Sequence, residues 1–150
     1  MELFDERNIF EFTHPDFPDE RLVACRNPEL RKLRGHKRGA LLEATERELT
    51  KVKAMVERGT IECKDKIGLR VGAIINKYKM AKHFVLDIQE QSLNFRVDDE
   101  GVAAEAALDG IYVLRTSLPK ERLSTEDVVR SYKSLSQVER AFRSMKTMDL

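Results

Sequence analysis

The sequence lacks the features that mark membrane-spanning and secreted proteins. It contains no run of roughly 18 apolar residues, the length needed to cross a bilayer. Its first ten residues, MELFDERNIF, have neither the basic segment nor the apolar segment of a secretory signal. The two cysteines, Cys25 and Cys63, form no CxxC pair and have no His pair nearby. These absences predict a cytoplasmic protein with two reduced, structural cysteines and no membrane partner.

An excess of charge of one sign is also missing. The 150 residues include 27 Lys plus Arg and 26 Asp plus Glu, a net charge of +1. Bulk electrostatics therefore gives no reason to expect nucleic-acid binding, and any basic surface must be local. The sequence has no GxSxG nucleophile motif and no glycine-rich phosphate loop. The three histidines show no ligand spacing, which argues against a histidine metal site.

Hydrophobic residues make up 41% of the chain and charged residues 35%, which is within the globular range. Apolar spacings of three and four predict helices, and strict alternation predicts strands. The strand IYVLRTS carries little charge and is predicted to be buried on both faces. In chain order the predicted elements are short strands at 9–13 and 21–25, helices at about 29–58 and 65–82, a β-hairpin at 83–97, a short Ala-rich helix ended by Gly110, the strand at 111–117 and a final helical segment.

The first long helix has one apolar seam, which predicts packing against a neighbouring helix, and the helix at 65–82 is the candidate partner. Gly59 is predicted to end the first helix, and Asp65 to cap the second. Ser124 and Asp127 resemble a capping box at the start of the last helical segment, which is either one kinked helix or two in succession. The seam consists of Leu42, Thr45, Leu49, Val52 and Val56.

Two basic clusters could follow a phosphate backbone. RKLRGHKRG, residues 31–39, is the densest basic run, and Lys77, Lys79 and Lys82 surround Tyr78. The alternative for the first cluster is a charged helix start. For the second it is a solvated helix end, where cations are favourable. For both clusters, the prediction prefers this alternative to phosphate binding.

The final helical segment, YKSLSQVERAFRSMK, places a carboxylate within a semi-apolar stripe. An unpaired carboxylate is costly to bury, so Glu139 should meet a cation, a hydrogen-bond donor or a metal ion. An acid with cations on its face suits a divalent ion beside a phosphodiester. The alternative is an ion pair with Arg143 or Arg140 at the solvent boundary. The stripe consists of Tyr132, Leu135, Glu139, Phe142 and Lys146, and Arg143 lies on the same face.

Tyr132, Glu139 and Lys146 stand at the spacings of a known signature: Tyr, two residues, Arg, three residues, Glu, six residues, Lys. The segment thus resembles the C-terminal signature of bacterial insertion-sequence transposases of the DDE superfamily. Leu135 occupies the Arg position, which is a departure from the pattern. The preceding AAEAALDGIYVLRTS resembles the Asp-Gly-aromatic strand ahead of the catalytic helix in that family. NKYKMAKHF with the following hairpin resembles the family's insertion region.

The resemblance implies an α+β fold, with a partial RNase H-like catalytic core and an insertion region built from a helical hairpin and a β-hairpin. It implies two divalent cations, Mg²⁺ or Mn²⁺, held by Asp, Asp and Glu, with Glu139 as the last acid. One metal would activate water or a 3′-hydroxyl, and the other would stabilise the leaving oxygen. Tyr132 and Lys146 would contact DNA near the scissile phosphate, and Arg143 is added as a helper. The implied partners are transposon-end DNA and, for the intact protein, a second copy in a homodimer.

The two aspartates that this chemistry needs have no candidates in the sequence. Asp5, Asp16 and Asp19 lie in polar or Pro-interrupted stretches, and Asp109 is expected to form a turn with Gly110. The chain also stops shortly after the signature. The prediction is therefore a truncated piece of a transposase that does not cut DNA alone, with residues 1–110 as insertion region and 111–150 as the last strand and Glu-bearing helix of the core.

Two alternatives remain open at this point. One is a non-catalytic interaction module whose helical seam, Leu42 to Val56, pairs with a partner protein and in which Glu139 only forms an ion pair. The other is a decayed, unfolded remnant.

Overall fold

A computed structural model of the chain describes residues 6–148. Within the last helix it describes the backbone, but not the side chains, of Ser136, Phe142 and residues 145–148. The fold is mixed α and β and has two compact units, which we describe separately. The terminal unit contains residues 6–28 and 110–148, and the central unit contains residues 29–109.

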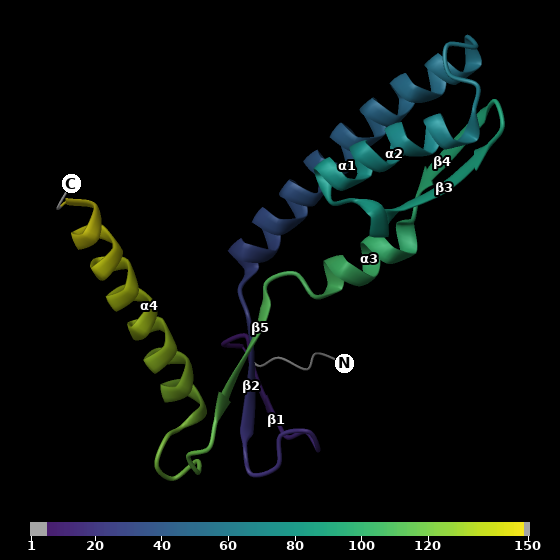
Figure 1. Cartoon of the computed structure of the whole chain (residues 1–150). Helices are drawn as coiled ribbons and strands as arrows, with labels where there is room; N and C mark the ends of the chain where they lie inside the picture. Colours follow the sequence, from purple (N-terminus) through teal and green to yellow (C-terminus); the bar gives the residue numbers. More distant parts are fainter. Residues whose placement is uncertain (1–5, 149–150) are drawn as a thin grey trace. The chain divides into compact units, whose positions relative to one another are not determined.

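The terminal unit is a three-stranded antiparallel sheet with one helix (Figure 1). Its strands β1 (Ile9–Phe12), β2 (Arg21–Arg26) and β5 (Ile111–Thr116) lie in the order β1-β2-β5. The register places Ile9 opposite Cys25, and Cys25 opposite Tyr112. Helix α4 (Thr125–Met148) packs Val128 and Val129 on this face of the sheet, and the result is a small hydrophobic core.

Strand β5 is an edge strand, and its exposed residues alternate with partly buried ones. The prediction that it is buried on both faces is therefore wrong, because only β2 pairs with it and Val113 remains exposed. The strand also joins distant parts of the chain, since β2 pairs with it along its whole length. Residues 6–28 thus belong with the last third of the chain, whereas the sequence-based division kept residues 1–110 together.

The central unit contains a helical hairpin and a β-hairpin that share one core. Helices α1 (Pro28–Glu57) and α2 (Lys64–Tyr78) are followed by a short 3₁₀ turn (Ala81–His83), strands β3 (Phe84–Gln89) and β4 (Ser92–Val97), and helix α3 (Asp99–Ala107). Leu49 of α1 is fully buried, in one cluster with Ile67 and Val71 of α2 and Phe84 of β3. The predicted pairing of the two helices is confirmed.

The ends of these two helices are partly as expected. Helix α1 ends at Glu57, and Gly59 has a φ of 71°, which favours glycine, so its predicted role is confirmed. Helix α2 begins after Cys63, and no side chain caps it. Asp65 lies inside the first turn, so its predicted capping role is wrong, although a carboxylate is favourable there. Helix α2 stops at Tyr78, because Lys79 adopts the left-handed conformation.

Among the residues described, no helix combines the length and apolar character that a membrane span requires.

The shared core predicts a large difference between two leucines of helix α1. Leu49→Ala removes a fully buried side chain, and we expect it to lower the free energy of unfolding by roughly 2–5 kcal/mol. Leu33→Ala is the matched control, since Leu33 is 64% exposed, and it should cost less than about 0.5 kcal/mol. Urea unfolding followed by circular dichroism measures both. Equal losses would contradict the described core.

Candidate functional site on helix α4

Helix α4 carries the residues of the sequence signature. Its start is a capping box: the Ser124 hydroxyl donates to the Asp127 carboxylate at 2.9 Å, and the Asp127 N–H donates to Ser124 Oγ at 3.2 Å. From Thr125 the helix runs for 24 residues without a break, so the segment is one helix and not two. Tyr132, Glu139 and Lys146 are seven residues apart in turn, and they therefore lie along one stripe.

This stripe faces solvent in the described part of the helix. Tyr132 is 47% exposed, Leu135 is 65% exposed, and the Glu139 side chain is 73% exposed. The stripe does not face a core, because among the described residues the small sheet contacts only the first two turns of α4, through Val128, Val129 and Tyr132. The side chains of Phe142 and Lys146 lie outside the described part of the structure.

Glu139 makes an ion pair with Arg143, which is the alternative that the sequence left open. Glu139 Oε2 lies 3.9 Å from Arg143 Nη2, one helical turn on, and both side chains are largely exposed. Exposed pairs of this spacing contribute only about 0.3–0.5 kcal/mol. The Glu139 carboxylate is therefore held weakly and remains accessible to another cation.

Tyr132 lies against the sheet. Its ring centroid is 5.7 Å from that of Tyr112 in β5, with 35° between the ring planes. Burial raises the pKa of Tyr112 to about 12, so this phenol stays neutral. Contact with a neutral, partly buried ring restricts the motion of Tyr132 while half of its own surface stays open to solvent.

The start of α4 is held in place by an arginine that the sequence did not single out. Arg21 Nη2 donates to Glu11 Oε2 at 2.8 Å, and Arg21 Nη1 donates to the carbonyls of Leu118 and Leu123, each at 2.9 Å. The Thr125 hydroxyl also donates to Glu11. We call Glu11, Arg21 and Thr125 the Arg21 cluster. Since it joins β1 and β2 to the loop that leads into α4, it determines where the helix begins.

The same cluster changes the acidity of Glu11. The hydrogen bonds from Arg21, followed by the one from Thr125, lower the pKa of Glu11 to about 2. No periodic pattern announces this cluster, because Glu11 and Arg21 lie on different strands and meet only through the strand register. The usable signal is a pair of opposite charges, Glu11 and Arg21, on two short strands whose other residues are mostly apolar.

The described residues do not form a two-metal site by themselves. They contain no group of three or more His, Cys, Asp or Glu side chains that could hold a metal ion. Glu139 could supply at most two oxygens, whereas Mg²⁺ prefers about six ligands. Asp16 and Asp19 are exposed, and Asp5 lies outside the described residues. Asp109 lies in the turn after α3, where it pairs with Arg38 at 2.6 Å.

Comparison of the chain with protein-family models, with curated proteins and with solved structures finds no match. A functional assignment therefore depends on the residues of α4 and on the strand that precedes it.

The Arg21 cluster predicts a pH-dependent contribution to stability. Glu11 has a folded pKa of about 2 against an ordinary value of 4.5, so its stabilising effect is complete above pH 4.5 and is lost between pH 4.5 and 2. We expect Glu11→Gln to lower the unfolding free energy by about 1–3 kcal/mol at pH 7 and to have little effect near pH 2. Urea unfolding at several pH values measures this. The exposed control Glu43→Gln should change little at any pH, and a constant effect of Glu11→Gln would contradict the assignment.

Proposed function

We propose that this chain is part of a DDE transposase and contributes the Glu-bearing helix and the insertion region. The observation that carries the proposal is the unbroken course of α4 from Thr125 to Met148. A break would have separated the signature residues, whereas one helix keeps Tyr132, Glu139 and Lys146 on a common stripe. In this proposal the terminal unit is a late portion of an RNase H-like core, in which β5 leads into the catalytic helix.

The exposure of the stripe supports this assignment. An acid that binds a metal ion next to a DNA phosphate must be reachable from outside, and the Glu139 side chain is 73% exposed. Arg143, which lies within 4 Å of Glu139, is exposed as well and is suited to neutralise a phosphate. Tyr132, two helical turns before Glu139 on the same stripe, leaves about half of its surface exposed. An acid, a cation and an aromatic side chain thus share one accessible face.

Glu139 would contribute one ligand to Mg²⁺ or Mn²⁺, and two aspartates from other parts of the intact protein would provide the rest. Without them this chain does not cut DNA, and we expect it to bind DNA weakly, without sequence preference and with strong salt dependence. Leu135 stands where the signature has Arg, so one phosphate contact of the pattern is missing. The intact protein would act on transposon ends in the cytoplasm as a homodimer.

The interaction-module alternative requires that a partner protein can reach the apolar seam of α1. Its seam was to pair with a partner protein, but Leu49, Val52 and Val56 are buried within the central unit. Helix α2 and the β-hairpin already cover them. A partner could reach this seam only by displacing elements of the same chain, which would expose the core.

A strand-cleavage assay tests the proposal. The reading frame, extended upstream to include two acids that each follow an apolar strand, is expressed and given plasmid-borne transposon ends with Mg²⁺. Altering groups that merely support a metal ligand costs roughly 10–100-fold, so Glu139→Gln, which replaces a ligand, should cost more than about 100-fold.

The control for this assay is Glu46→Gln, because Glu46 is exposed on α1 and should leave cleavage unchanged. Full activity of the Glu139 variant would refute the proposal. The absence of two such acids upstream would also refute it.

A further inference from the structure

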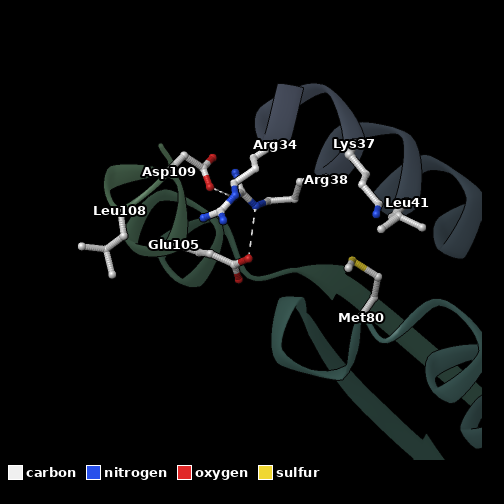
Figure 2. A pocket seen from close by; sticks show the side chains of 8 residues that line it. All are labelled: Arg34, Lys37, Arg38, Leu41, Met80, Glu105, Leu108 and Asp109. Atoms are coloured by element: carbon white, nitrogen blue, oxygen red, sulfur yellow. Dashed lines mark hydrogen bonds and ion pairs between the residues drawn. The ribbon is translucent and has the colours of Figure 1, made fainter. Parts of the chain in front are cut away.

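The central unit has an open cleft of about 280 Å³ between helix α1 and the end of helix α3 (Figure 2). The α1 wall is formed by Arg34, Lys37, Arg38 and Leu41, which recur at helical spacing. Glu105 of α3 and Asp109 of the following turn form the opposite wall. The cleft therefore has cations on one side and acids on the other.

The acids of this cleft already have partners. Arg38, which is 92% buried because only 8% of its surface is exposed, places Nη2 at 2.6 Å from Asp109 Oδ1. Its Nε lies 3.7 Å from Glu105 Oε1, as the dashed lines in Figure 2 show. Glu105 also meets Lys82 Nζ at 2.5 Å and His83 Nε2 at 2.9 Å. Both carboxylates are thus committed to cations inside the unit.

These contacts keep the acids ionised. The Arg38 guanidinium, with a smaller effect from Arg34, holds the pKa of Asp109 below its usual range. The hydrogen bond from Lys82 likewise lowers the pKa of Glu105. The direct contacts of both acids are thus made to Arg38 and Lys82, and the remaining cations of the cleft are neutralised only in part.

Those remaining cations are Arg34 and Lys37. Both are exposed, and neither makes an ion pair within 4.0 Å in the described part of the chain. Four cations gather at the cleft when Arg38 and Lys82 are counted with these two, whereas the acids are only Glu105 and Asp109. The rim of the cleft therefore carries net positive charge. The apolar surface beside the rim comes from Leu41, Met80 and Leu108. This combination favours an anion that also presents apolar groups.

We propose that the cleft binds the phosphodiester backbone of DNA. Arg34 and Lys37 would pair with phosphates, and the apolar side chains would contact deoxyribose. The two cations lie three residues apart, about 4.5 Å along the helix axis, so their long side chains can reach neighbouring phosphates of one strand. Arg31 extends the row in the N-terminal direction. The choice of DNA among polyanions rests on the proposed function, whereas the preference for an anion rests on the cleft alone.

Fluorescence anisotropy with a labelled duplex of about 20 base pairs tests this, with the chain as it is and a series of salt concentrations. The double variant Arg34→Ala/Lys37→Ala should bind roughly tenfold more weakly at 0.1 M salt, and the slope of log affinity against log salt should fall by about two. The melting temperature should fall by no more than a few degrees, because both side chains are exposed and Arg34 acts on Asp109 only through its charge, without a direct ion pair.

The control is Arg47→Ala/Lys66→Ala, which removes the same charge from exposed positions elsewhere in the central unit. This control variant should change the salt slope by less than about half as much as Arg34→Ala/Lys37→Ala does, since it alters only the net charge of the chain. Equal losses in the two variants, or no duplex binding by the unmodified chain at low salt, would overturn the proposal. So would binding of polyglutamate in preference to the duplex, which would assign the cleft to an acidic protein. Since no readout involves Glu139, any of these failures is distinguishable from failure of the strand-cleavage assay.

Discussion

The terminal unit depends on the guanidinium of Arg21. One side chain donates to the Glu11 carboxylate on β1 and to two carbonyls, those of Leu118 and Leu123, in the loop before α4. Hydrogen bonds to charged groups contribute about 1.5–3 kcal/mol each, more than the exposed ion pairs on the helix surface. The position of α4, and with it the position of Glu139, therefore follows from a contact made far from Glu139 in the sequence.

Each unit pairs a mostly buried arginine with an acid from another element. In the terminal unit Arg21 pairs with Glu11, and in the central unit Arg38 pairs with Asp109. Each pair neutralises an acid that would otherwise repel a phosphate. A chain with a net charge of only +1 can in this way present locally basic surfaces. The cleft beside Arg34 is one such surface, and in the proposed function it is where a chain of balanced composition would contact DNA.

Local features of the fold could be predicted from the sequence, and long-range features could not. The helix predicted at 29–58 is found at Pro28–Glu57, because its apolar seam and Gly59 are local signals. The pairing of β2 with β5 has no such signal, since it joins segments on opposite sides of the central unit. The basic run at 31–39 predicts a charged helix start, but it gives no signal that Arg38 is buried against Asp109, because that contact joins α1 to the turn after α3.

For the candidate site the spacing of the signature residues was predictable, and their surroundings were not. A helical period is enough to align Tyr132 with Glu139, and the continuous α4 agrees with it. The exposure of the stripe depends on how much of the helix the sheet covers. The periodicity of the sequence carries no information about that coverage. The contact between Tyr132 and Tyr112 likewise depends on how α4 packs on β5.

The most direct test of the central claim is where Mn²⁺ binds when DNA is present. In amide NMR spectra of the protein extended upstream to include the two further acids, with a short duplex present, bound Mn²⁺ broadens the resonances of residues near the ion. If Glu139 holds a divalent ion beside a DNA phosphate, broadening should be strongest around residue 139, should require the duplex and should disappear in Glu139→Gln. Broadening centred on another acidic segment, or unchanged in that variant, would contradict the account.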